Sequence, residues 1–103
     1  MVDEVKGSWT LEELRARRNE ILALAEQYGA EDVRVFGSVA RGDATPRSDV
    51  DILVRFPPDY RLLDHAGFLM ALKELLGAEV DVSIEANLRE AYRLEILKDA
   101  VPL

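Results

Sequence analysis

The apolar run VDILV at residues 50–54 constrains the fold of this chain more than any other feature. A nearly continuous apolar run of this length is typical of a strand that is buried on both faces of a sheet. Pro57 and Pro58 end the strand, because proline has no N–H to donate to a ladder. An amphipathic helix that stops at Gly77 follows, and then an alternating segment at residues 79–84. We therefore expect two adjacent parallel strands, joined by a right-handed helical crossover.

The residues before this unit predict a helix and a short strand. Apolar residues recur at spacings of three, four and seven from Thr10 to near Gly29, which indicates one amphipathic helix. The β-rich run at residues 33–36 indicates a strand that stops at Gly37. The connection from Gly37 to the central strand is short and rich in turn residues, so we expect these two strands to run antiparallel.

A last helix is predicted after Asn87, which could cap it, and Pro102 marks its expected end. Its apolar residues include Tyr92 and Leu94, which we interpret as core or interface residues. The fold class expected from these segments is α/β, a small mixed β-sheet packed by helices in the order α-β-α-β-α-β-α. Residues 1–9 lack periodicity and are predicted to form a flexible leader, and residues 10–103 are predicted to form a single domain.

Composition excludes several classes of function. A formal net charge of -7 would repel a phosphate backbone, so direct nucleic-acid binding is not expected. The chain has no cysteine, so it can form neither a disulfide framework nor a thiolate zinc site. No apolar run approaches the length of a membrane-spanning helix. We therefore expect a cytoplasmic protein that does not bind a membrane.

The segment GSVARG at residues 37–42 has the composition of a phosphate-binding turn. Gly37 would let the backbone approach a ligand closely, and Ser38 would begin a helical turn whose N–H groups and hydroxyl can bind an anion. Arg41 would lie one turn further on, where its guanidinium could form paired hydrogen bonds with phosphate oxygens. Ser38 could also be a simple helix cap and Arg41 an ordinary surface arginine, and both alternatives remain open.

Three aspartates are expected near this turn. Asp49 and Asp51 stand two apart at the start of the central strand, so both carboxylates would project to one face of the sheet. Asp81 lies near the start of the parallel neighbour, at a matching height. Carboxylate oxygens are the ligands that Mg²⁺ prefers, so the three acids predict a site for two such ions in phosphoryl chemistry. Asp81 could also act as the general base toward an attacking hydroxyl. Taken alone, the first two acids could equally be turn or cap residues.

One spacing resembles the GS-x10-DxD pattern of the DNA polymerase β-like nucleotidyltransferase superfamily. It consists of Gly37-Ser38, ten further residues and then Asp49-Val50-Asp51. The short chain is similar to the minimal nucleotidyltransferase (MNT) family of that superfamily. The resemblance extends from the first helix to the closing AVPL at residues 100–103. It implies the nucleotidyltransferase fold and transfer of a nucleotide, AMP from ATP or another NTP, to a hydroxyl group.

The resemblance also implies a role for each matching residue. Those that would contact the NTP phosphates are Gly37, Ser38 and Arg41, and those that would hold Mg²⁺ are Asp49, Asp51 and Asp81. Proteins of the MNT family commonly act as antitoxins to toxins with a HEPN domain, adding AMP to a toxin tyrosine. The implied acceptor is therefore a HEPN-domain partner protein.

Two residues depart from the family pattern. Arg47 stands in a loop where relatives often have an acidic or neutral residue, and Ser83 interrupts what is usually a more apolar third strand. Neither replaces a predicted metal ligand. A second hypothesis is a non-catalytic, nucleotide-binding antitoxin that neutralises its partner by binding, since an acidic surface suits a basic partner. A third is transfer to a small-molecule hydroxyl, for which a chain this short offers few residues to form a pocket.

Overall fold

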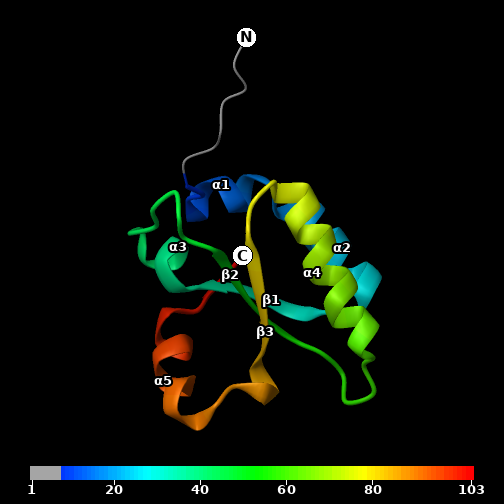
Figure 1. Cartoon of the computed structure of the whole chain (residues 1–103). Helices are drawn as coiled ribbons and strands as arrows, with labels where there is room; N and C mark the ends of the chain where they lie inside the picture. Colours follow the sequence, from blue (N-terminus) through cyan, green and yellow to red (C-terminus); the bar gives the residue numbers. More distant parts are fainter. Residues whose placement is uncertain (1–7) are drawn as a thin grey trace.

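The computed structural model describes residues 8–103, so the first seven residues of the predicted leader lie outside it. A four-stranded mixed sheet lies between two pairs of helices, α2 and α4 on one side and α3 and α5 on the other (Figure 1). The elements in chain order are α1 (Leu11–Ala16), α2 (Arg18–Tyr28), β1 (Glu31–Phe36), α3 (Gly37–Arg41), β2 (Val50–Arg55), α4 (Leu62–Leu76), β3 (Val80–Ile84), the 3-10 turn η1 (Glu85–Asn87), α5 (Glu90–Asp99) and β4 (Val101–Pro102). The predicted α/β class with a small mixed sheet is confirmed.

The strands lie in the order β3-β2-β1-β4. β2 and β3 are parallel, with Val50 opposite Val80 and Asp51 opposite Asp81. β1 runs antiparallel to β2, with Phe36 opposite Asp51. Both predicted strand relations are confirmed, because a 15-residue helix carries the chain from β2 to β3 whereas the link from β1 to β2 is short and turns back.

Alternate strand residues give the sheet two different faces. On the core face, which carries Val35, Ile52 and Val82, the sheet packs against α2 and α4. The helix residues that are buried there are Leu14, Ile21, Ala25, Phe68, Leu72 and Leu76. The site face carries Asp51, Asp81 and the other strand residues of opposite orientation. The main apolar cluster therefore lies on one side of the sheet. The other side carries the acids together with the buried Leu53 and Phe36.

The first predicted helix is broken into α1 and α2 at Arg17, so the expectation of one continuous helix is wrong. The Arg17 N–H donates to the carbonyl of Leu14 over 3.0 Å, which tightens the turn and changes the direction of the chain. Thr10 caps α1 as predicted, in a reciprocal capping box with Glu13. Leu14 and Ile21 are both fully buried, so the two short helices still present one apolar stripe to the core.

The C-terminal prediction needs two corrections. Asn87 lies in η1, and α5 begins at Glu90 and ends at Asp99. The chain then turns to extended structure and pairs with β1, so Pro102 belongs to strand β4 and does not end a helix. Tyr92 and Leu94 are not core residues, because they are 60% and 82% exposed. Their alternative interpretation as interface residues stays a prediction.

Within residues 8–103, no helix has the length and apolarity that crossing a membrane requires.

Candidate active site

The sheet places the predicted acids at one end of its site face. Asp51 is the second residue of β2 and Asp81 the second of β3, and the parallel register puts them directly opposite each other. Asp49 precedes β2 by one residue and is exposed. Asp51 and Asp81 are 30 positions apart in the sequence. They become neighbours because the α4 crossover returns the chain to the same end of the sheet.

The charges of these acids act on one another. Asp51 is half-buried, and its pKa is raised to about 6, first by burial and then by the negative charges of Asp81 and Asp49. The positive charge of Arg41 acts in the opposite direction and lowers the pKa of Asp51. The carboxylates therefore repel one another near neutral pH, and a bound cation would relieve that repulsion.

Gly37 lies against Asp51. It joins β1 to α3 with a φ of +72°, a conformation that L side chains rarely adopt. A β-carbon added at Gly37 would lie 2.3 Å from Asp51 Oδ2. Only glycine therefore lets the start of α3 approach the carboxylate this closely, which is the close backbone approach that the sequence predicted.

Ser38 lies in the first turn of α3 and is half-buried. Its carbonyl accepts hydrogen bonds from the N–H groups of Gly42 and Asp43 over 2.9 and 3.0 Å, which closes the short helix. The chain then forms a second turn, in which the Thr45 N–H donates to Ser48 Oγ over 2.9 Å. These two turns carry the chain from the predicted phosphate loop directly to Asp49.

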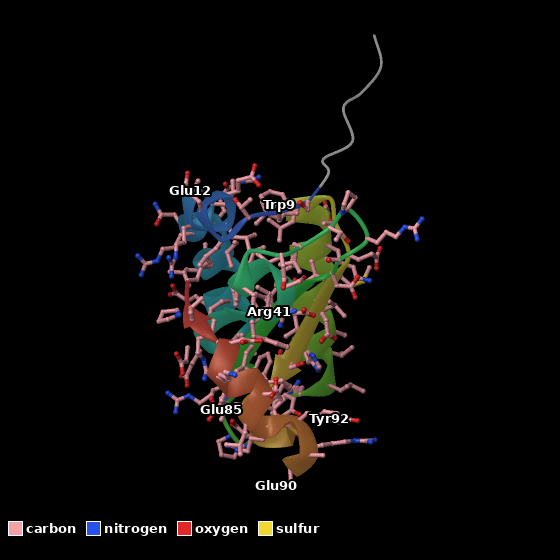
Figure 2. All side chains as sticks on the ribbon, turned by 90° about the vertical axis from the view of Figure 1, so that its left-hand side faces the viewer. Trp9, Glu12, Arg41, Glu85, Glu90 and Tyr92 are labelled. Carbon is pink, nitrogen blue, oxygen red and sulfur yellow. The ribbon has the colours of Figure 1, made fainter. Side chains whose placement is uncertain are left out.

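Arg41 is the predicted site residue with the most defined contacts. Its Nη1 donates to Asp99 Oδ2 of α5 over 2.7 Å, and its Nε donates to Asp43 Oδ2 over 3.3 Å. Because both partners are acidic, they raise the pKa of the Arg41 guanidinium, the Asp99 bond more than the Asp43 bond. Arg41 lies beside the C-terminal end of α5 in the view of the site face (Figure 2).

Three polar residues near the site were not predicted from the sequence as site residues. Ser83 lies on the site face and donates from Oγ to Asp81 Oδ2 over 3.3 Å, so it contacts a predicted metal ligand although it interrupts the apolar pattern of the strand. Asp43 and Asp99 hold Arg41. The i, i+2 spacing in a strand could have indicated Ser83. Nothing in the local pattern indicates Asp99, which reaches Arg41 from 58 positions along the chain.

The three carboxylates form an electrostatic cluster and not a finished chelate. Among residues 8–103, no three acidic or histidine side chains have the arrangement of a ready-made metal site. Asp51 and Asp81 thus lie opposite each other, and the charges of Asp81 and Asp49 both act on Asp51, as expected. The three carboxylates do not meet at a common point. Mg²⁺ usually binds through one or two carboxylates together with substrate phosphates, so this donor set still suits an ion that arrives with a nucleotide.

A search for related proteins gives consistent matches. The family model described as "Nucleotidyltransferase domain" matches residues 18–103. The protein adenylyltransferase MntA of Thermococcus cleftensis is 38% identical over 96 residues, which cover 89% of this chain and 94% of that protein. Both the site segment and most of the fold are therefore shared with a relative of nearly the same length.

Solved structures show the same fold. A structure described as that of a candidate minimal nucleotidyltransferase is 49% identical to this chain, with a TM-score of 0.81, and the match covers 92% of this chain and 97% of the other. The MNT antitoxin in a complex with the tri-AMPylated HEPN toxin of Shewanella oneidensis is 16% identical, with a TM-score of 0.65, and the match covers 85% of this chain and 69% of the other. At that low identity the second likeness concerns the fold alone.

Proposed function

This chain belongs to the minimal nucleotidyltransferase family, and from that premise we propose that it transfers AMP from ATP to a hydroxyl group of a partner protein in an Mg²⁺-dependent reaction. The single observation that carries the proposal is the contact of Gly37 with Asp51, which itself lies opposite Asp81. A glycine-serine turn that can accept phosphates lies directly against carboxylates that can hold the metal. This combination is what phosphoryl transfer requires, because its catalysis consists mainly of positioning and charge stabilisation.

The proposed reaction forms one bond and breaks another at the α-phosphorus of ATP. The acceptor oxygen attacks that phosphorus, the bond to the β-phosphate oxygen breaks, and pyrophosphate leaves. Asp81 is exposed and receives the Ser83 hydrogen bond on Oδ2, so Oδ1 can take the proton of the attacking hydroxyl. Ser38 and Arg41 bind the phosphates of the substrate, and Gly37 keeps the backbone close to them.

The proposed metal ligands are Asp49, Asp51 and Asp81. Their oxygens are hard donors, and both the burial of Asp51 and the negative charges of Asp81 and Asp49 raise the pKa of Asp51, so the donor set fits Mg²⁺. When bound, Mg²⁺ supplies positive charge that offsets the negative charge of the phosphates. Asp51 is held most firmly of the three, because it lies within β2 and against Gly37. Asp49 and Asp81 are exposed and can turn toward the incoming nucleotide.

For the partner, we propose a HEPN-domain toxin, with a toxin tyrosine as acceptor and this chain as the antitoxin. The support is that a relative covering most of this chain is a protein adenylyltransferase, and that a protein of the same fold forms a complex with an AMPylated HEPN toxin. The formal charge of -7 favours a partner surface with basic groups.

The test combines the purified chain with α-labelled ATP, Mg²⁺ and the protein encoded beside it. We expect label on the partner, removal of the label-transfer activity by EDTA, and its restoration by added Mg²⁺. Mass spectrometry should locate AMP on a tyrosine. A folded chain that transfers no label from any NTP to its correct neighbour would disprove the proposed activity.

A double variant separates catalysis from simple binding of the partner. Asp49→Ala with Asp51→Ala should abolish label transfer and leave the toxin active in a growth or nuclease assay. Asp59→Ala, an exposed acid in the loop after β2, serves as the control for a lost surface charge. If the double variant still neutralises the toxin, the chain acts as a non-catalytic antitoxin that works by binding.

A further inference from the structure

The strongest unexplained contact near the site is the ion pair between Asp99 and Arg41. It joins the last residue of α5 to the last residue of α3 over 2.7 Å. The Asp99 side chain is 18% exposed and the Arg41 side chain 47% exposed. An ion pair with one partly buried, hydrogen-bonded member holds its geometry better than a fully exposed pair.

The contact leaves part of the guanidinium available. Arginine has five N–H donors in a planar fork. Asp99 accepts from Nη1 and Asp43 accepts from Nε, so both donors on Nη2 and one on Nη1 have no part in these two bonds. The outer Nη1–Nη2 edge can therefore bind two phosphate oxygens while Asp99 stays in place. Asp99 and a phosphate group need not compete for the same hydrogen atoms.

The position of Asp99 depends on few other contacts. α5 has no buried residue, although it lies on the site face of the sheet (Figure 1). Nearer its start, Arg93 Nη1 donates to the carbonyl of Glu85 over 3.1 Å. At its end, Asp99 binds Arg41 and the chain then enters β4, which pairs with β1. The strand β4, which follows Asp99, pairs with β1, and β1 leads directly into α3, which carries Arg41. This pairing therefore fixes Asp99 relative to Arg41.

We infer that Asp99 is a positioning residue for nucleotide binding, which holds Arg41 Nη1 so that the free edge of the guanidinium faces the triphosphate. The inference rests on the proposed function. A long, half-exposed arginine loses rotamer freedom when it binds a phosphate. With Asp99 in place, that loss has already occurred in the free protein, and nucleotide binding is tighter for this reason.

The experiment measures Mg²⁺–ATP binding by titration calorimetry with the full chain, together with KM and kcat for transfer to the partner. Asp99→Ala should weaken ATP binding and raise KM about tenfold, with kcat changed little, because the lost contact serves the bound nucleotide in both the ground and transition states. Asp99→Glu keeps the acceptor and should restore most of the affinity. It also serves as the second variant if Asp99→Ala does not fold.

Two further variants separate positioning from a purely structural role. Arg93→Gln removes the hydrogen bond and the ion pair that Arg93 of α5 forms with Glu85, and it should leave ATP affinity unchanged. Arg41→Gln should lose at least as much affinity as Asp99→Ala, and the double variant should lose no more than Arg41→Gln alone. Two outcomes would overturn this inference while leaving the proposed function intact, provided that the wild-type chain binds ATP. One is that the losses of the two single variants add in the double variant, and the other is that Asp99→Ala binds ATP as tightly as the wild type or more tightly. A wild-type chain that binds no Mg²⁺–ATP would overturn the proposed function and this inference with it.

Discussion

The two faces of the sheet are stabilised in different ways. On the core face, the strand residues of β1, β2 and β3 pack against α2 and α4 mainly through apolar side chains. On the site face, α3 and α5 are joined by the Arg41–Asp99 ion pair, and Arg34 of β1 forms an ion pair with Glu85. α5 contributes no buried residue, whereas α4 contributes three. The same strands thus carry the main apolar cluster on one side, and on the other side charged residues beside the buried Leu53 and Phe36.

This difference assigns separate tasks to the two faces. Apolar burial supplies most of the free energy of folding, and it does not require exact charge geometry. Burial of a charged group and like charges close together both oppose folding, and both raise the pKa of Asp51, burial more than the charges. The core face therefore stabilises a fold whose site face costs stability. We expect a substitution on the core face to act mainly on stability and one on the site face to act mainly on activity.

The largest expected effect separates these two quantities at a single residue. Asp51→Asn removes a proposed metal ligand and should lower the rate of nucleotidyl transfer at least about a thousandfold, or about 4 kcal/mol of transition-state stabilisation. Because the amide carries no charge near Asp81 and Asp49, the fold should not lose stability. Labelled-ATP transfer and thermal melting of the same preparation test both parts. A variant that transfers normally would remove Asp51 from the proposed site.

The opposite pattern is expected on the core face. Phe68 is fully buried between α4 and the sheet. Phe68→Ala should lower the free energy of unfolding by about 3–4 kcal/mol, since it removes apolar contacts and leaves a cavity. Urea denaturation followed by far-UV circular dichroism measures the change. Met70→Ala on the exposed side of the same helix is the control and should change stability little, because Met70 is 62% exposed.

A pair of glycines tests how far the site face depends on close backbone approach. Gly37 and Gly42 both have positive φ values, of +72° and +85°, so alanine at either position strains the backbone by about 1–2 kcal/mol. Only at Gly37 would the new β-carbon meet Asp51; at Gly42 nothing lies within 4 Å. Gly37→Ala should therefore reduce transfer at least about thirtyfold beyond Gly42→Ala, or about 2 kcal/mol. Equal activities would show that the contact has no functional consequence.

The smallest expected effect is a pH dependence of stability in metal-free buffer. The pKa of Asp51 is raised from 3.8 to about 6, so between these values the folded chain binds a proton that the unfolded chain does not. The contribution of this group to stability is therefore highest below pH 4 and is lost as the pH rises through 6. Asp51→Asn should be more stable than the wild type by about 1 kcal/mol at pH 7.5, after allowance for screening by water, and equally stable near pH 4. A difference that does not change with pH would contradict the electrostatic account.

The sequence predicted the parallel pair β2 and β3 and the placement of Gly37 near the acids, because these follow from local patterns. Strand alternation and the lengths of the connections determine which residues share a face and which strands are neighbours. The break at Arg17 was not predicted, since the apolar stripe continues across it. The sequence left open whether Tyr92 and Leu94 lie in the core or at an interface, because an apolar residue on a short helix gives no sign of what covers it, and the structure excludes the core.

By itself, the sequence predicted which residues serve phosphate and metal chemistry and determined at which strand ends they lie. Spacing is a local property, and the 3.6- and 2-residue periods translate it directly into position on an element. Only the tertiary structure decided that Asp99 holds Arg41, that Ser83 contacts Asp81 and that the three carboxylates remain apart while their charges interact. These relations depend on side-chain directions between elements distant in the chain, which packing and electrostatic repulsion set together.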